Sequence, residues 1–179
     1  MKLEPLHIEG AYRLRPERRG DERGHLERLF CRETFRELGL KDCSEQVSEV
    51  VNARAHTLRG LHFQRAPHGE TKLIRVTRGA VFDVLVDIRP DSPSFGRWQG
   101  FELSAGDNCL IYAPAGLAHG YLTLSDDSAM LYFIDTPYAA DQAAGLHYAD
   151  PALAIAWPAE PAVIADRDRV WPNLKDLAP

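Results

Sequence analysis

The chain has 179 residues, of which 45% are hydrophobic and 26% are charged, and its net charge at pH 7 is −5. This length and composition suit one globular domain whose core needs no disulfides or metal ions to fold. The negative charge argues against nucleic acid as the main partner. The sequence has no run of about 18 apolar residues and no charged-then-apolar leader, so we expect neither a membrane span nor a signal peptide.

The cysteines Cys31, Cys43 and Cys109 are odd in number and widely spaced, and none belongs to a CxxC motif. Disulfide frameworks and zinc sites use even or closely spaced sets of cysteines. We therefore expect reduced thiols in a cytoplasmic protein.

In chain order, the expected elements are one short helix and a series of strands. The basic run 13–24 (RLRPERRGDERG) is interpreted as a solvated loop in preference to a phosphate-binding segment. Residues 32–40 (RETFRELGL) predict the helix, because Phe35 and Leu38 are spaced for one face and Gly39 ends the run. Segments rich in β-branched and aromatic residues, separated by turn sequences, predict strands over 57–64, 72–78, 80–88, 97–103, 108–113 and 129–136.

Short strands at close spacing with a single helix favour a sandwich or barrel over a βαβ fold. The last forty residues are rich in Pro, Ala and Asp, and we expect them to wrap the barrel as loops and short helices. Residues 1–179 are predicted to form one all-β domain.

Polar side chains fall inside several of these strands. Alternation along a strand places His62 and Gln64 on one face and Arg59 on the other, so Arg59 could join them only through a bulge or at a strand end. A lone inward histidine in a barrel is usually a hydrogen-bonded structural residue. Here a His, a Lys, an Arg, a Tyr and an Asp lie on or beside neighbouring strands, and burying them without a ligand would be costly. The cluster predicts a binding pocket at the barrel mouth.

Residues 112–124 (YAPAGLAHGYLTL) contain a turn at Pro114 and Gly116, followed by a strand that brings His119 inward. This pattern resembles the second motif of the cupin superfamily, PxGxxH. The resemblance supports a cupin-type jelly roll, or double-stranded β-helix, with a few short peripheral helices.

Cupins commonly bind a metal through a first motif of HxH form, but here His62 is followed by Phe63 and Gln64. A site of two histidines and a third ligand could still be built from His62 and His119 with Glu70 or His56. However, His56 lies in a polar turn, and Glu70 is close to Lys72, whose charge opposes a dication. We expect no metal and no other cofactor.

Segments spread over nearly the whole chain resemble the dTDP-4-dehydrorhamnose 3,5-epimerase family, which are metal-free cupins of nucleotide-sugar metabolism. The combination of LRGLHFQ with the pattern DVxVDIRxxSPxFG is specific to this family. The matching segments are DERG (21–24), LRGLHFQ (58–64), ETKLIRVTRGAVFDVLVDIRPDSPSFGRW (70–98), APAGLAHGYLTLS (113–125), LYFIDTPY (131–138), the DP and IAWP pair (150–158) and DRVWP (168–172).

The resemblance implies a role for each matching residue. The implied catalytic residues are His62 as the base, Asp168 as its dyad partner, Tyr132 as the general acid and Lys72 near the ketone oxygen. The implied substrate-binding residues are Arg23 and Arg59 at the diphosphate, together with Gln46, Asp83, His119 and Tyr138. Proton removal beside a ketone needs a base, a donor for the forming oxyanion and an acid on the opposite face, and these residue types can supply all three.

The implied activity is that of an isomerase that epimerises C3 and C5 of a nucleotide-linked 4-keto-6-deoxyhexose through an enolate. The substrate is expected to be dTDP-4-dehydro-6-deoxyglucose or a close analogue, used in dTDP-rhamnose, deoxysugar and polysaccharide biosynthesis. The resemblance also implies a cytoplasmic homodimer, since sites in this family borrow an N-terminal segment from the partner.

Three alternatives stay open: an epimerase acting at C3 or C5 only on a different nucleotide sugar, a metal-dependent cupin oxygenase, and a non-catalytic sugar-binding module. Two departures bear on the first of these. The family often has Glu where Arg28 stands, and Asn-x-Ser where this chain has SEVVNA (48–53). Both segments help hold the nucleotide and the sugar in many members, so the chemistry is better defined than the substrate.

Overall fold

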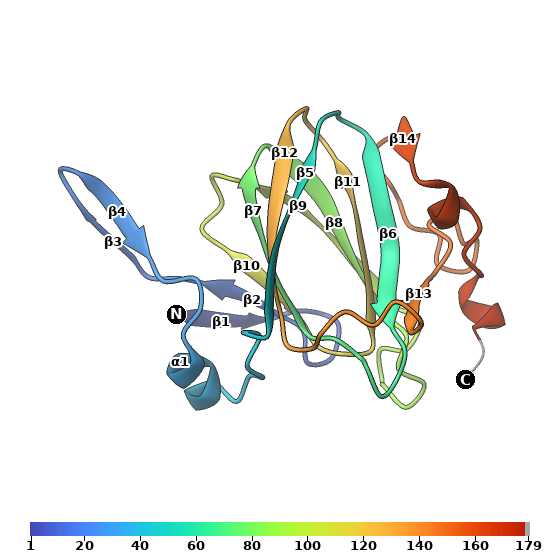
Figure 1. The fold of residues 1–179 in the computed structure, drawn as a ribbon, viewed down its shortest axis with the longest axis horizontal. Helices are drawn as coiled ribbons and strands as arrows, with labels where there is room; N and C mark the ends of the chain where they lie inside the picture. Colours follow the sequence, from blue (N-terminus) through green and yellow to red (C-terminus); the bar gives the residue numbers. More distant parts are fainter. Residues whose placement is uncertain (178–179) are drawn as a thin grey trace.

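The computed structural model describes residues 1–177 and consists mainly of two β-sheets that face each other (Figure 1). The first sheet has the strand order β1-β2-β10-β7-β12-β5, and all its pairings are antiparallel. Its strands are β1 (Lys2–Pro5), β2 (Tyr12–Arg15), β10 (Leu110–Ala113), β7 (Lys72–Arg78), β12 (Ser128–Ile134) and β5 (Gln46–Asn52).

The second sheet has the order β13-β6-β11-β8-β9, and the short β14 pairs in parallel with β6. Its strands are β13 (Ala143–Gly145), β6 (Thr57–Gln64), β11 (Leu117–Thr123), β8 (Ala80–Asp87), β9 (Trp98–Ser104) and β14 (Val163–Ile164). A separate hairpin of β3 (Arg18–Asp21) and β4 (Gly24–Glu27) projects away from the sheets, as Figure 1 shows.

The main core lies between the two sheets and follows the alternation of their strands. Ile74 and Val76 of the first sheet pack in one buried cluster with Val81 and Leu85 of the second. Full burial of such a side chain contributes about 1.5–3 kcal/mol. The inward face of each strand is therefore strongly determined, and the all-β, cupin-like architecture predicted from the sequence is confirmed.

A second cluster covers the outer face of the second sheet. Leu61 and Val84 pack there against the C-terminal segment, which contributes Leu146 and Leu153. This segment contains the 3₁₀ helices η1 (Asp166–Arg169) and η2 (Leu174–Asp176), so it wraps the sheet as loops and short helices. The wrapping matters for function because η1 carries Asp168 to the middle of β6, beside Gly60 and His62.

The predicted helix forms α1 (Arg32–Glu37), and it ends three residues earlier than the segment 32–40. The loop prediction for residues 13–24 is wrong, since this run enters β2 and then forms β3. Every residue of β3 is exposed, so the strand shows no apolar alternation from which it could be predicted. The three cysteines are free thiols. No helix within residues 1–177 is long and apolar enough to cross a membrane.

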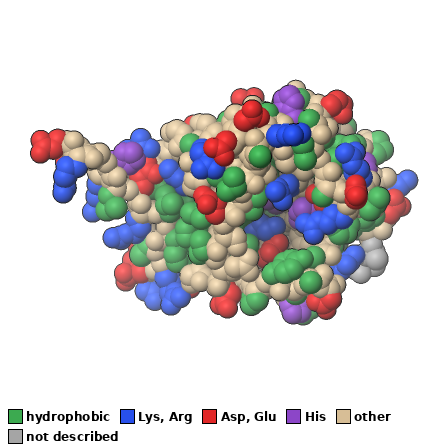
Figure 2. Space-filling model, turned by 45° about the horizontal axis from the view of Figure 1, so that its top comes forward, with side chains coloured by type: hydrophobic (Ala, Val, Ile, Leu, Met, Phe, Trp, Pro, Cys, Tyr) green, Lys and Arg blue, Asp and Glu red, His purple; other side chains and the backbone are tan. Residues whose placement is uncertain are grey.

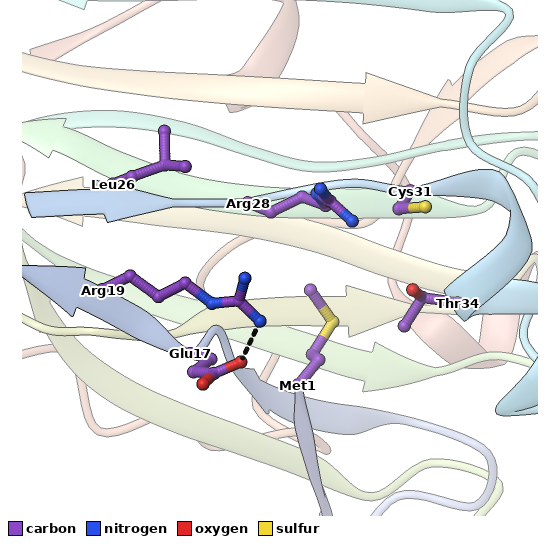
Figure 3. A pocket seen from close by; sticks show the side chains of 7 residues that line it. All are labelled: Met1, Glu17, Arg19, Leu26, Arg28, Cys31 and Thr34. Carbon is purple, nitrogen blue, oxygen red and sulfur yellow. Dashed lines mark hydrogen bonds and ion pairs between the residues drawn. The ribbon is translucent and has the colours of Figure 1, made fainter.

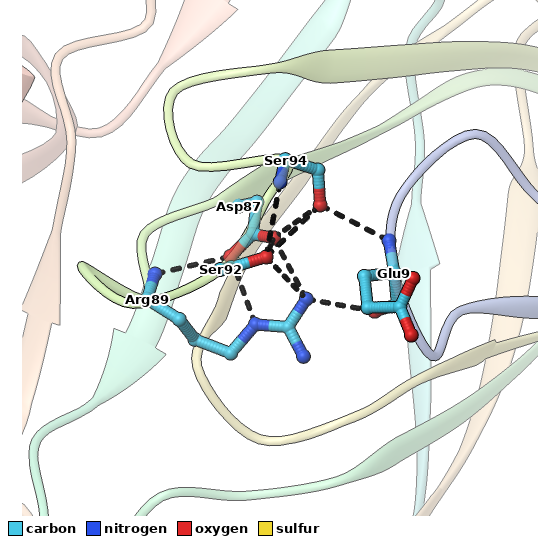
Figure 4. Close-up of polar contacts among 5 residues, drawn as sticks. All are labelled: Glu9, Asp87, Arg89, Ser92 and Ser94. Atoms are coloured by element: carbon cyan, nitrogen blue, oxygen red, sulfur yellow. Dashed lines mark hydrogen bonds and ion pairs between the residues drawn. The ribbon is translucent and has the colours of Figure 1, made fainter.

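The turn after β8 is held by a buried carboxylate (Figure 4). Asp87 Oδ2 accepts hydrogen bonds from Arg89 Nη2 at 2.7 Å and from Ser94 Oγ at 2.6 Å. Ser92 Oγ donates to the same oxygen, and Arg89 also reaches the Glu9 carbonyl at 2.7 Å. Burial alone would raise the pKa of Asp87, but the Arg89, Ser92 and Ser94 donors lower it to about 2. The network ties the β8–β9 turn to the N-terminal segment.

Candidate active site

A cavity of about 430 Å³ opens between the two sheets, and we call it the main cavity. Figure 2 looks onto a face where basic and histidine side chains gather around a recess. Both sheets and the C-terminal segment contribute to the lining. Its polar residues are Gln46, Ser48, Arg59, His62, Gln64, Glu70, Lys72, His119, Tyr121, Tyr132, Tyr138, Arg167 and Trp171.

A bulge in β6 brings Arg59 and His62 to the same cavity. His119 pairs with His62 and Tyr121 pairs with Arg59, so β6 advances three residues while β11 advances two. Gly60 lies within the bulge with φ +133°, and a Cβ there would lie 2.4 Å from the backbone of Gly120. Only glycine permits this approach of the two strands. Of the two arrangements that the sequence pattern allowed for Arg59, a bulge or a strand end, the structure shows the bulge.

His62 and Asp168 form a close pair at the cavity wall. His62 Nε2 lies 2.7 Å from Asp168 Oδ1, and their side chains are 28% and 2% exposed. Burial alone would raise the pKa of Asp168. The hydrogen bonds and charge of His62, together with the N–H groups of Gly60 and Trp171, instead hold that pKa below its ordinary value. Asp168 is therefore a carboxylate at neutral pH, suited to orient the imidazole and to stabilise its protonated form.

Tyr132 reaches the cavity from β12, in the sheet opposite His62. Within residues 1–177 its hydroxyl has one hydrogen-bond acceptor, Met130 Sδ at 3.7 Å, which is a weak partner. Burial, the neighbouring Tyr121 and the charge of Asp83 raise the pKa of Tyr132 well above 10. The phenol therefore keeps its proton near neutral pH and leaves it available to a bound molecule.

A second histidine and aspartate pair lies beside Tyr132. His119 Nε2 lies 2.6 Å from Asp83 Oδ1, and the His119 ring packs edge-on against Tyr132 with centroids 5.8 Å apart. Asp83 is fully buried behind His119 and is absent from the cavity lining. The prediction that Asp83 itself lines the pocket therefore differs from the structure, because His119 stands between the carboxylate and the cavity.

Lys72, from the start of β7, also lines the main cavity. Its ammonium lies 2.8 Å from Glu70 Oε1, and the two side chains are only 11% and 12% exposed. Gln46 of β5 donates to Ser48 Oγ at 3.1 Å, and Tyr138 lies at the cavity with a largely exposed ring. The cavity thus holds a base candidate, an acid candidate and a cation on separate strands.

The family described as dTDP-4-dehydrorhamnose 3,5-epimerase matches residues 5–176. The chain belongs to this family. The dTDP-4-dehydrorhamnose 3,5-epimerase of Sinorhizobium fredii is 39% identical over 178 residues, covering 99% of this chain and 91% of that protein.

Solved structures agree with this assignment. The crystal structure of dTDP-4-dehydrorhamnose 3,5-epimerase from Bacillus anthracis with TDP and PPi bound matches with a TM-score of 0.92 and 38% identity, covering 96% of this chain and 98% of that one. A 3'-monoepimerase from Streptomyces bikiniensis in complex with dTDP-quinovose matches with a TM-score of 0.88 and 37% identity, covering 96% and 87%.

Arg23, which the family resemblance assigns to the diphosphate of the substrate, lies apart from the other predicted site residues. Arg23 lies on the β3–β4 hairpin, outside the main cavity, and its side chain is 85% exposed. It pairs with Asp21, the residue two positions before it. A smaller cavity of about 180 Å³ lies at the base of this hairpin, lined by Arg19, Arg28 and five other residues (Figure 3). Within one chain, the main cavity is lined by every predicted site residue except Arg23 and the two buried aspartates, Asp83 and Asp168, which lie behind His119 and His62.

Sequence reasoning missed several lining residues of this epimerase-family site. Tyr121 follows His119 by two positions on β11, so alternation could have identified it. Its hydroxyl and the guanidinium Nε of Arg59 both donate to Asn52 Oδ1, at 3.2 and 2.8 Å. Trp171 belongs to the same DRVWP segment as Asp168, but its contact with the cavity depends on how that irregular segment folds.

Proposed function

We propose that the protein epimerises C3 and C5 of a nucleoside-diphosphate-linked 4-keto-6-deoxyhexose, dTDP-4-dehydro-6-deoxyglucose or a close analogue, without a cofactor. The observation that carries the proposal is that His62, paired with Asp168, and Tyr132 line one cavity from opposite sheets. Family membership and the nucleotide ligands of the matched structures support the substrate class.

In the first step, His62 removes the proton from a carbon beside the C4 ketone. The C–H bond breaks, its electrons form the enolate, and the imidazole becomes an imidazolium. Because Nε2 faces Asp168, the other ring nitrogen, Nδ1, is the atom left for the substrate. Positioned general bases of this kind typically contribute a factor of about 10²–10⁴ to the rate.

The negative charge of the enolate collects on the C4 oxygen. Lys72 is the cation placed to meet it, because its ammonium lines the cavity and is nearly buried. A preorganised charge in a partly desolvated site stabilises such an oxyanion better than water does. C3 and C5 both flank C4, so one oxyanion site can serve both inversions.

Tyr132 then gives its proton to the enolate carbon from the opposite side of the ring. A carbanion-like carbon is far more basic than a phenolate, so a tyrosine whose pKa is raised is still an adequate acid. Solvent returns a proton to Tyr132 and accepts the one held by His62. Inversion follows because base and acid come from different sheets.

We also propose that the protein works as a cytoplasmic homodimer in which the β3–β4 hairpin carries Arg23 to the diphosphate in the partner's cavity. The hairpin projects from its own subunit (Figure 1). Arg23 lies in the turn between its two strands and is exposed. The outer face of the first sheet also exposes Val47 and Val51 of β5. Apolar exposure of this kind suits an interface. Light scattering at micromolar concentration would measure the mass.

The metal-dependent oxygenase is a weaker candidate because the possible ligands are already paired. His62 faces Asp168, His119 faces Asp83 and Glu70 faces Lys72. No group of three His, Cys, Asp or Glu side chains in the described part of the chain is arranged to hold a metal ion. The fourth possible ligand, His56, does not line the main cavity.

The deciding experiment is NMR of solvent deuterium incorporation with dTDP-, GDP- and CDP-linked 4-keto-6-deoxy sugars. We expect exchange and inversion at both C3 and C5 with the preferred substrate. Exchange at C3 alone would favour the alternative of an epimerase that acts at one carbon only, as the name of the matched 3'-monoepimerase says of that protein. No exchange with any of these sugars would contradict the proposal.

A further inference from the structure

Trp171 contacts the same carboxylate oxygen as His62. Its indole Nε1 donates to Asp168 Oδ1 at 3.1 Å, and His62 Nε2 lies 2.7 Å from that oxygen. The indole and imidazole rings meet edge-on, with centroids 6.4 Å apart and planes at 76°. One oxygen atom therefore serves two N–H groups, and both rings line the main cavity.

The position of the indole is fixed by the backbone of β13. Gly145 pairs with His62 in the β13–β6 register, so it lies directly beside the base on the neighbouring strand. A Cβ at Gly145 would lie 2.6 Å from Trp171 Nε1. Any side chain at residue 145 would therefore push the indole away from Asp168. The absence of a side chain at this position is what leaves room for the shared hydrogen bond.

Sharing the oxygen changes how strongly Asp168 holds a proton on His62. A carboxylate whose charge is partly satisfied by another donor stabilises the neighbouring imidazolium less. We propose that Trp171 is a positioning residue that keeps His62 neutral, and so able to accept a proton, by sharing Asp168 Oδ1. This inference rests on the proposed function of His62 as the base.

Other charged groups also surround the His62–Asp168 pair. Arg167 Nε lies 3.5 Å from Asp168 Oδ1 in η1, and Arg59 lies on the same strand as His62. The surrounding strands and loops also carry two ion pairs, Lys72–Glu70 and His119–Asp83, and the phenols of Tyr132 and Tyr138. Within residues 1–177 Trp171 makes no hydrogen bond with any of these groups, so a comparison of variants tests the indole N–H on Asp168.

The test uses Trp171→Phe, which keeps an aromatic ring and removes the donor. The pH dependence of kcat/KM for deuterium exchange is measured beside an NMR titration of the His62 ring protons in the substrate-free protein. We expect the acid limb of the profile and the NMR midpoint both to move to higher pH by about 0.4 to 1 unit, the range expected for losing one hydrogen bond.

The matched control is Trp157→Phe. Trp157 also donates one indole hydrogen bond, to the Tyr148 carbonyl at 2.9 Å, but it lies outside the main cavity. We expect neither titration to move in this variant. A second variant, Gly145→Ala, keeps the indole but displaces it, and we expect it to shift both titrations in the same direction as Trp171→Phe.

Unchanged titrations in folded Trp171→Phe and Gly145→Ala would overturn the inference. The indole would then have a packing role and no effect on the protonation of His62. Shifts of the same size in the Trp157→Phe control would overturn it as well. If the NMR midpoint of His62 moves while the acid limb of the kcat/KM profile does not, Trp171 does act on His62 through Asp168 and the inference stands. That result would contradict the proposed function, because His62 would then not be the base.

Discussion

Asp168 lies 2.7 Å from His62 although the two residues are 106 positions apart in the sequence. The pair forms because the C-terminal segment returns to the middle of β6 and buries the carboxylate beside the bulge at Gly60. This contact is the basis of the first prediction.

His62→Ala should abolish deuterium exchange at every sugar carbon while nucleotide-sugar binding largely survives. The imidazole is the proposed base, and losing a general base typically costs a factor of about 10²–10⁴. Exchange is followed by NMR and binding by calorimetry. His68→Ala, which removes an exposed histidine outside the cavity, is the matched control. Normal exchange in His62→Ala would remove His62 from the mechanism.

Tyr132→Phe should separate enolate formation from inversion. The ring keeps its packing and only the hydroxyl is lost, so His62 can still form the enolate and return a solvent-derived proton to the original face. We expect exchange with retained configuration and little epimer. The measurement is the ratio of exchange to inversion in variant and wild type. If water reaches the far face, slow inversion will remain. An unchanged ratio with both rates near normal would point to Tyr138 as the acid.

Excess chelator should leave the activity of the purified protein unchanged. The possible metal ligands at the cavity, His62, His119 and Glu70, are engaged in ion pairs, and the charge of Lys72 beside Glu70 opposes a dication. Initial rates are compared before and after dialysis against chelator. Loss of activity that zinc or iron restores would contradict the metal-free mechanism.

A mixture of two inactive variants should recover activity if Arg23 acts on the partner's site. In a dimer of His62→Ala with Arg23→Ala, one cavity carries both changes and the other carries neither. Random pairing at equal amounts should then give about a quarter of the wild-type rate. The variants are mixed, unfolded, refolded together and assayed. No recovery despite dimer formation would place Arg23 in its own subunit's site, and normal activity of Arg23→Ala alone would place it outside the reaction.

Asp87→Asn should lower the free energy of unfolding at pH 7 by about 2 kcal/mol. The folded-state pKa of about 2 lies below the ordinary value of 3.8, so the carboxylate stabilises the fold fully above pH 3.8 and loses this effect as the pH falls toward 2. Urea unfolding of wild type and variant should therefore converge over that range. Asp91→Asn, at an exposed position in the same turn, is the control. A difference that persists below pH 2 would contradict the assignment.

The sequence by itself determined the fold class and most of the cavity. Segments rich in β-branched and aromatic residues identified β7, β8 and β12 as strands, and both faces of these strands are largely buried. Alternation placed His62 on the same face as Gln64, and the structure shows both at the main cavity. The motifs around His62 and Tyr132 carried the family resemblance, which the match over residues 5–176 confirms.

Only the tertiary structure decided how the polar groups meet. The bulge that turns Arg59 toward His62 depends on the contact between Gly60 and Gly120, which are distant in sequence. The β3–β4 hairpin escaped prediction because neither face of it is buried in its own chain. The contacts of Asp168 with His62 and Trp171, and the burial of Asp83 behind His119, arise from irregular backbone and from neighbouring strands. Local patterning carries no information about such contacts, because they are set by which segments the folded chain brings together.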